Sequence, residues 1–452
     1  MLNEKILTYI ENKNMEKLKT LLANAEEMEI LYAFNDLSSD EQVIAFRLLA
    51  KDKALSIFEE LDTDLQQNLL RSFTDERAIE FVNEMAPDDR VKLLDELPAN
   101  VAKKLINSLS SEEREITNTL MGYKPETAGR IMTTEYISLK KDMSAEQALA
   151  KVRRQAKDKE TIYTLFVTDN AKKLEGVLTL KELLIADSNS IIGEIMSKKT
   201  INVSTDTDQE EVAKTLQELD LLAIPVTDKE ERLVGIVTID DAVDVLQEET
   251  TEDILDQAGF ADVAGPEADR SETLINGSLW SIWRVRLPFL LITLAAGMAA
   301  GAIIGGFEEI LESIAVVAIF IPLIMDMGGN VGTQSSTLFV RGVVLGHINI
   351  KNFLKHFMKE IGIGLSMGLL IGTSAGIIAA IWQGMPLLGL AVGLSLLFTM
   401  TLAALLGFLV PYALIKFNMD QTAGSGPIIT SIKDITGLIV YFVLVSIFLG
   451  YL

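Results

Sequence analysis

Five long apolar stretches dominate the C-terminal third of the chain. They cover residues 287–307, 314–344, 361–382, 387–415 and 428–451. Each stretch is long enough to cross a hydrocarbon core of about 30 Å at about 1.5 Å per helical residue. The pattern predicts an all-α transmembrane domain of five helices over residues 284–452.

Residues 1–125 follow a shorter pattern, in which an apolar residue, a capping residue or proline, and then acidic residues recur. The starts lie at Leu37, Leu61, Phe73, Met85, Leu97 and Leu109, and the last five are 12 residues apart. Capping side chains and acids in a first turn are typical of helix N-termini. The repetition therefore predicts a superhelical α-solenoid, in which each helix buries its apolar face on its neighbours.

Residues 126–247 contain an internal duplication. The first copy carries Thr164-Leu-Phe-Val-Thr-Asp and Leu174-Glu-Gly-Val-Leu-Thr, and the second carries Ala223-Ile-Pro-Val-Thr-Asp and Leu233-Val-Gly-Ile-Val-Thr. Apolar β-branched runs that alternate with helical stretches predict α/β units. The repeated Gly-x-x-Thr-x-x-Asp/Glu turn resembles that of a tandem CBS pair, a regulatory module that often binds nucleotides or ions.

Charge is strongly segregated along the chain. Residues 284–452 hold seven acidic and eight basic side chains, whereas residues 1–283 hold 57 acidic and 32 basic ones. An acidic soluble region argues against nucleic-acid binding, which needs a basic surface. The absence of cysteine excludes disulfides, thiolate metal sites and cysteine nucleophiles. An enzyme is not expected, because the sequence shows neither a nucleophile–base pair nor a phosphate-binding loop.

The linker over residues 248–283 and the segment just before it hold the densest run of acids. As a helix, this segment places a set of carboxylates on one broad face, where like charges repel. The set includes Asp241, Asp244, Glu249, Glu252 and Asp253. Two interpretations stay open: a solvated helix and hinge, or a face neutralised by a divalent cation, because hard cations take carboxylate oxygens.

Charged residues within predicted spans are functional candidates, because a charge is costly in the hydrocarbon region. They are Asp326, Arg341, Lys433 and Asp434. Side chains of adjacent helical residues point about 100° apart, so we expect no direct bridge between Lys433 and Asp434. The polar, glycine-rich run at residues 327–337 predicts a break in the second span, at a helix contact or an ion path.

Loop charges predict the orientation of the five spans. Basic residues precede the first span and follow the second and the fourth, and they are Arg284, Arg286, Lys351, Lys355, Lys359 and Lys416. Cytoplasmic loops carry the excess of Lys and Arg. We therefore expect a multi-pass protein of a bacterial-type inner membrane, with its N-terminus in the cytoplasm and its C-terminus outside.

The order of these parts resembles the MgtE family of magnesium channels along essentially the whole chain. Two motifs are specific: Pro322 with Gly328-Gly329-Asn330-x-Gly332-x-Gln334-Ser335, and Gly426-Pro427-x-x-Thr430-x-x-x-Asp434-x-x-Gly437. The resemblance implies a homodimer in the lipid bilayer, with a pore lined by the second and fifth spans. It implies that Asp434 recognises the ion, with Asn330 and Gln334 also in the pore.

The resemblance also implies regulation, in which cytosolic Mg²⁺ binds acidic residues and holds the pore closed. Matching positions are Asp208, Glu210, Asp220, Asp241, Asp244, Glu249, Glu252, Asp253 and Asp420. In the helical N-domain, Glu84 and Asp88 are further candidates. Thr238 and Asp241 are candidates for binding ATP at the CBS pair, because many such pairs hold a ribose at this acid.

The sequence thus favours a Mg²⁺-selective channel closed by its own ion. Two alternatives remain. One is a transporter of other divalent cations such as Mn²⁺ or Co²⁺, since the oxygen-ligand arguments apply to Mn²⁺ equally. The other is a non-conducting, membrane-tethered nucleotide sensor, against which Asp434 and the polar run in the second span argue, because a passive anchor needs no charge in the hydrocarbon region.

Overall fold

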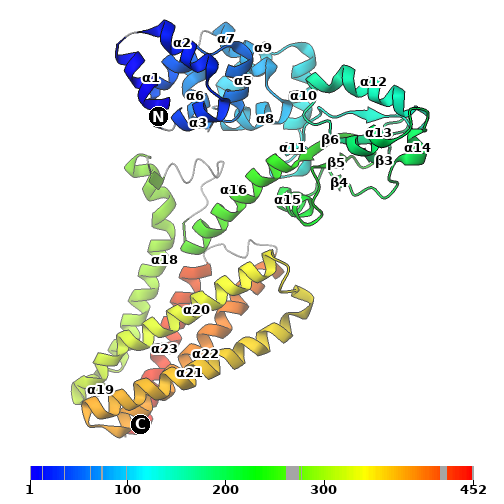
Figure 1. The fold of residues 1–452 in the computed structure, drawn as a ribbon. Coiled ribbons are helices and arrows are strands. Elements are labelled where there is room, and N and C mark those ends of the chain that lie inside the picture. The colour runs from blue at the N-terminus through cyan, green and yellow to red at the C-terminus, as the bar shows by residue number, and fades with distance from the viewer. Residues whose placement is uncertain are drawn as a thin grey trace. The chain divides into compact units, whose positions relative to one another are not determined.

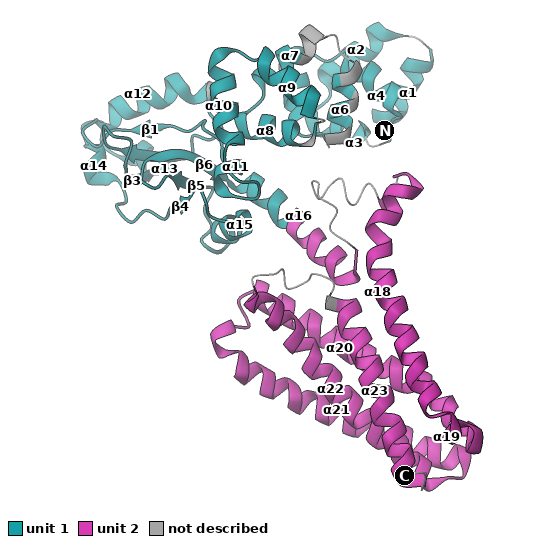
Figure 2. Ribbon diagram, turned by 180° about the vertical axis from the view of Figure 1, so that it is seen from behind, with its two compact units in different colours: residues 1–247 teal, residues 248–452 magenta. Residues whose placement is uncertain are grey.

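The computed structural model describes residues 2–449 except 13, 35, 62, 73–74, 98, 261–273, 276 and 418–424. It divides into two compact units, an N-terminal unit of residues 1–247 and a membrane unit of residues 248–452, each described by itself (Figure 2). The N-terminal unit begins with short helices (Figure 1): α1 Leu2–Glu11, α2 Met15–Asn24, α3 Glu27–Phe34, α4 Ser39–Phe46, α5 Lys51–Glu59, α6 Thr63–Ser72, α7 Asp75–Glu84, α8 Pro87–Glu96, α9 Ala99–Ser108 and α10 Ser111–Met121.

These helices confirm the repeat seen in the sequence. Helix α4 and each of α6 to α10 begin two residues after a predicted start. Helix α5 begins two residues after Leu49, which lies midway between the predicted starts Leu37 and Leu61. At the starts that the structure describes, the apolar residue packs inward, as buried Leu49, Leu61 and Leu109 do. Phe46, Phe58 and Phe81 form the centre of the core, with ring centroids 5.7 to 6.1 Å apart.

The duplicated region forms two three-stranded sheets of the same design. The first copy contains α11 Ala128–Ile131, β1 Ser138–Leu139, α12 Ala145–Gln155, β2 Thr164–Thr168, β3 Leu174–Thr179 and α13 Leu180–Ile185. The second contains α14 Ile192–Ile195, β4 Val203–Ser204, α15 Gln209–Glu218, β5 Ala223–Thr227, β6 Leu233–Thr238 and α16 Ile239–Ala258. In each sheet the first strand pairs parallel and the third antiparallel to the middle one. The register shifts after the fourth residue of both middle strands, so the copies share even this irregularity.

The membrane unit contains five helices long and apolar enough to cross a membrane, within the described ranges. Its elements after α16 are α18 Leu279–Gly306, α19 Glu308–Ser313, the 3-10 turns η2 Ala315–Phe320 and η3 Ile350–Asn352, α20 Ile321–Val344, α21 Phe353–Gln383, α22 Pro386–Lys416 and α23 Ser425–Leu449. Helices α20 to α23 form one bundle, and α18 contacts α23 (Figures 1 and 2). The predicted fold class is confirmed.

The predicted break in the second span was wrong. Helix α20 runs unbroken through residues 327–337, and the irregular segment is instead η2, before it. The glycines serve close packing: a Cβ at Gly328 would lie 2.9 Å from Thr399 Cγ2, and one at Gly332 would lie 2.9 Å from Ile429 Cγ2. Small residues let membrane helices approach without opening the backbone hydrogen bonds.

Helices α18 and α21 each carry a ladder of glycines four residues apart, and the two ladders differ in their surroundings. On α21, Gly372 and Gly376 face the backbone of Gly393 and Gly389 on α22, and an added Cβ would lie 2.4 and 2.7 Å from their carbonyl oxygens. On α18, the ladder of Gly297, Gly301 and Gly305 has nothing within 4 Å of an added Cβ. The first ladder joins two helices of one chain, and the second faces outward.

Candidate functional site

The predicted selectivity carboxylate lies on α23, where it forms an ion pair with its neighbour. Lys433 Nζ lies 2.6 Å from Asp434 Oδ1, and the two side chains are 2% and 21% exposed. Our expectation that these residues form no bridge was wrong, because the flexible lysine stem turns its ammonium back towards the adjacent carboxylate. Lys433 Nζ also donates to the Met325 carbonyl, which ties α23 to α20.

Asn330 and Gln334 lie on an exposed face of α20, four residues apart. Asp326 lies one turn earlier on the same face, and Asn330 Nδ2 donates to Asp326 Oδ2 at 3.3 Å. Polar groups on the outer face of a membrane helix need water, protein or an ion against them. The exposed polar face of α20 is therefore a surface for a hydrated path or for another protein surface.

A buried carboxyl next to this motif escaped the sequence reasoning. Glu360 of α21 is 7% exposed, and its Oε1 accepts a hydrogen bond from Ser335 Oγ at 2.6 Å. It lies one residue before the apolar run expected for the third span, so the hydropathy pattern placed it in the loop before that span. Its bond to Ser335 links α21 to the Gly-Gly-Asn motif of α20.

A second acidic site lies in the N-terminal unit, where the start of α8 meets the start of α16. Burial first, and then the charges of Asp241 and Asp89, raise the pKa of the Asp88 carboxyl well above its ordinary range. Burial together with the charge of Asp241 raises the pKa of Asp89 to about 8, and burial raises that of Asp241 to about 6. Carboxyls that raise one another's pKa lie close together, and such a group is a candidate functional site.

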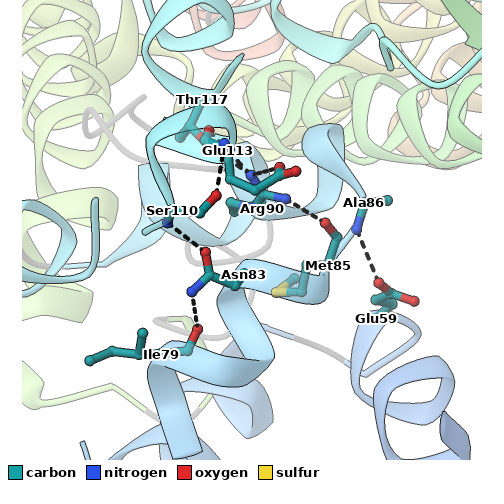
Figure 3. Close-up of polar contacts among 9 residues, drawn as sticks. All are labelled: Glu59, Ile79, Asn83, Met85, Ala86, Arg90, Ser110, Glu113 and Thr117. Atoms are coloured by element: carbon teal, nitrogen blue, oxygen red, sulfur yellow. Dashed lines mark hydrogen bonds and ion pairs between the residues drawn. The ribbon is translucent and has the colours of Figure 1, made fainter. Parts of the chain in front are cut away.

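The surroundings of α8 fix these acids in place (Figure 3). Glu59 at the end of α5 accepts a hydrogen bond from the Ala86 backbone N–H at 3.1 Å, just before α8 begins. Burial raises the pKa of Glu59 despite this bond. Arg90, 1% exposed, donates to the Met85 carbonyl at 2.7 Å and to Glu113 Oε2 at 2.6 Å. The first turn of α8 is thus held from both sides.

We name Glu59, Asp88, Asp89 and Asp241 the acidic cluster. Asp88 Oδ1 is buried and has no hydrogen-bond partner among the described residues. All four side chains of the acidic cluster are carboxylates, so the ligands that they could offer a metal ion are oxygen atoms. Such a donor set fits a hard divalent cation. Within the described ranges no group of three or more acidic or histidine side chains is arranged to hold a metal ion, so the acidic cluster is not a preformed metal site.

The other predicted regulatory acids divide into three groups. Asp208 Oδ1 accepts from Glu210 N at 2.9 Å as the cap of α15, and Glu210 pairs with Lys214 at 2.5 Å, so both have local structural contacts. Asp220 is an exposed turn residue with φ of 51° after α15. The structure does not bring these three to the acidic cluster.

The acids of the second group lie along α16. The third group consists of Glu84 and Asp420, neither of which is placed in the acidic cluster. Asp244 is exposed and lies 3.7 Å from Lys92 of α8, whereas Glu249, Glu252 and Asp253 lie further along the helix, in the membrane unit. Glu84 is outside the cluster, in a surface pair with Lys51 at 2.7 Å. Asp420 lies outside the described residues.

The predicted nucleotide residues are in contact with each other. Thr238 Oγ1 donates to Asp241 Oδ2 at 2.5 Å, at the point where β6 passes into α16. The first copy repeats the arrangement, since Thr179 Oγ1 donates to Glu182 Oε2 at 2.8 Å. Asp241 is therefore shared between the candidate nucleotide residues and the acidic cluster.

In the membrane unit, the end of α16 meets the start of α23. A Cβ at Gly426 would lie 2.4 Å from the Gln257 carbonyl oxygen, and one at Gly259 would lie 2.4 Å from Pro427 Cγ. Neither glycine leaves room for a side chain, one because of a backbone carbonyl and the other because of a proline ring. A displacement of the end of α16 would therefore press directly on the helix that carries Asp434.

Family models match four segments of this chain. The MgtE intracellular N domain matches residues 25–126, CBS domains match residues 128–189 and 192–248, and the MgtE divalent cation transporter domain matches residues 321–444. The magnesium transporter MgtE of Thermus thermophilus is 36% identical over 334 residues, which cover 74% of this chain and 72% of that protein. The magnesium transporter MgtE of Enterococcus faecalis is 33% identical over 342 residues, covering 75% and 73%.

Solved structures resemble the N-terminal unit. The cytosolic domain of the Mg²⁺ channel MgtE in complex with ATP matches with a TM-score of 0.52 and 32% identity, over 54% of this chain and 99% of that one. The soluble part of a magnesium transporter matches with a TM-score of 0.51 and 31% identity, over 55% and 98%.

Proposed function

Because the chain belongs to the MgtE family of magnesium transporters, we propose that it conducts Mg²⁺ across a membrane through a path selected by Asp434. The observation that carries this proposal is a partly exposed carboxylate on a helix that is long and apolar enough to cross a membrane. Mg²⁺ dehydrates reluctantly, so a carboxylate that contacts a largely hydrated ion suits its chemistry. Asn330 and Gln334 supply neutral oxygen and nitrogen groups for the ion's water shell.

Two copies of the chain form the conducting unit in this proposal. The exposed polar face of α20 would be costly against lipid and favourable against a second copy across a hydrated axis. The ladder of Gly297, Gly301 and Gly305 has open space beside it, which suits a helix of another chain. The N-terminus lies in the cytoplasm and the C-terminus outside, as the loop charges favour.

Flux into liposomes that hold only the purified protein tests the proposal. Asp434→Asn is expected to keep the fold and to abolish Mg²⁺ entry, because the substitution keeps the side-chain shape and removes the charge. Glu309→Gln, on the exposed helix α19, is the matched control and should conduct normally. Near-normal Mg²⁺ flux through Asp434→Asn would refute the assignment. Comparison of Mg²⁺, Mn²⁺, Co²⁺ and Ca²⁺ in the same vesicles separates the magnesium channel from a broader transporter.

Regulation follows from the acidic cluster and from α16. Without a divalent cation, burial and then the charge of Asp241 disfavour the ionised forms of Asp88 and Asp89, and this raises the pKa values of both carboxyls. Cytosolic Mg²⁺ neutralises them and holds the start of α16 against α8. The ion closes the path only if it binds the closed state more tightly, and a tenfold shift needs about 1.4 kcal/mol of differential affinity.

ATP is a second regulatory ligand in this proposal. A solved relative of the N-terminal unit is a complex with ATP, and Thr238 and Asp241 lie at the CBS turn suited to a ribose. Because Asp241 also belongs to the acidic cluster, nucleotide and cation binding are expected to be coupled. Isothermal titration of ATP at two Mg²⁺ concentrations measures that coupling, and an ATP affinity that does not depend on Mg²⁺ would contradict it.

A further inference from the structure

Lys433 is a buried cation for which the proposed conduction through Asp434 has no use so far. Its side chain is 2% exposed, and the ammonium lies 2.6 Å from Asp434 Oδ1. The same ammonium donates to the Met325 carbonyl on α20. A buried charge persists only when it is paired and hydrogen-bonded, and Lys433 has both kinds of partner.

The Gly-Gly-Asn motif makes room for this lysine. A Cβ at Gly328 would lie 3.1 Å from Lys433 Cδ, and one at Gly329 would lie 2.9 Å from Lys433 Nζ. Any larger residue at Gly329 would push the ammonium away from its two partners. The two glycines and the lysine thus form one arrangement, built from two helices, with the ammonium at its centre.

The pair with Asp434 is electrostatic and leaves part of the carboxylate accessible. Asp434 Oδ1 is buried and makes no hydrogen bond among the described residues, although the ammonium is close enough to attract it. The Asp434 side chain as a whole is 21% exposed, so its accessible part lies away from Lys433. An entering ion can reach the carboxylate from that side while the ammonium keeps its bond to Met325.

We propose that Lys433 is a tethered counter-cation that excludes monovalent ions from Asp434, an inference that rests on the proposed conduction through Asp434. The ammonium neutralises the carboxylate when no ion is bound. A monovalent ion that took the carboxylate from Lys433 would replace one unit charge by another, with no Coulombic gain. A divalent ion interacts twice as strongly with the same carboxylate, so it outcompetes the tethered ammonium. Lys433 is therefore a specificity-determining residue, and Gly328 and Gly329 are positioning residues for it.

Selectivity of flux in proteoliposomes tests this role. Lys433→Met keeps the length and apolar stem of the side chain and removes its charge. It is expected to raise the ratio of Na⁺ to Mg²⁺ flux by about tenfold or more, which is about 1.4 kcal/mol of lost discrimination. Gly329→Ala disturbs the same ammonium from the other helix and is expected to raise the ratio by less. Gly362→Ala is the matched control, because nothing lies within 4 Å of its added Cβ.

Because the two substitutions act on one group, their effects should not add. In the double variant, Gly329→Ala is expected to change nothing beyond Lys433→Met. A flux ratio within twofold of wild type in both single variants would overturn the inference and would leave Lys433 as a bond between helices. If Lys433→Met does not assemble, the difference in the Na⁺ to Mg²⁺ flux ratio between Gly329→Ala and Gly362→Ala tests the inference by itself. Asp434→Asn in the same vesicles separates the two levels, because normal Mg²⁺ flux there refutes the conduction proposal itself.

Discussion

The acidic cluster predicts that, without divalent cations, the N-terminal unit loses stability as the pH rises. Burial and the charges of Asp241, Glu59 and Glu160 raise the pKa of Asp89 to about 8, and only Lys92 opposes them. An unfolded aspartate has a pKa of about 3.9. The folded state therefore binds more protons than the unfolded state between these two values. The contribution of this carboxyl to the free energy of unfolding is fully present below about pH 4 and is lost as the pH rises towards about 8.

The size of the effect follows from the same two values. Between pH 6 and pH 8, one carboxyl whose pKa is about 8 in the folded state loses about 2 kcal/mol of folding free energy. For a unit of this size, that loss lowers the melting temperature by about 4 to 8 °C. In the proposed regulation Mg²⁺ binds the ionised carboxylates, so we expect it to restore more stability at pH 8 than at pH 6.

Thermal unfolding of residues 1–258, followed by circular dichroism with a chelator present, measures this slope. Asp89→Asn should flatten it and should reduce the stabilisation by Mg²⁺. Asp142→Asn, which removes an exposed acid elsewhere in the unit, should change neither. A melting temperature that stays constant or rises from pH 6 to pH 8 without divalent cations would refute the reasoning.

Three further predictions concern gating, packing and topology. Together, Asp244→Asn, Glu249→Gln, Glu252→Gln and Asp253→Asn should give a channel that conducts at Mg²⁺ concentrations that close the wild type, and closure at the same concentration would place the sensor elsewhere. Gly372→Val should destabilise the purified protein by about 1 to 3 kcal/mol, because its Cβ would lie 2.4 Å from the Gly393 carbonyl oxygen. Gly362→Val should not destabilise it, because the space beside Gly362 is open, and equal melting temperatures of the two variants would contradict the packing. A cysteine added after Leu452 should react with an impermeant thiol reagent on intact cells, and protection there would reverse the topology.

The sequence predicted the architecture well where structure follows from local signals. A capping serine and first-turn acids mark the starts of α4 and α10, and these signals act within one helical turn. The duplicated strands followed from repeated β-branched runs, and the spans followed from hydropathy. The glycine-rich run failed as a helix breaker because its neighbours are other helices: Gly332 packs on Ile429, a contact that no local pattern reveals.

The candidate site was predicted only in part. Asp434, Asn330 and Asp241 stand in recognisable motifs, but their partners come from distant parts of the chain. Glu59 and Asp89 carried no signal beyond that of ordinary helix-end acids, because which turn of α8 meets α16 depends on tertiary packing. The bridge between Lys433 and Asp434 was missed because the directions of adjacent Cβ atoms do not limit where a lysine ammonium can reach.

The glycine contacts divide the bundle into a frame and a moving part. Helices α21 and α22 interlock backbone to backbone, and Gly407 of α22 fits equally closely against Ser335 and Gly332 of α20. Contacts of this kind resist sliding, so we expect these three helices to move together. By contrast, α23 meets α20 through the side chains of Lys433 and Ile429, which can change rotamer. Opening and closing should therefore be a rocking of α23 against a stationary frame, with Lys433 as its pivot.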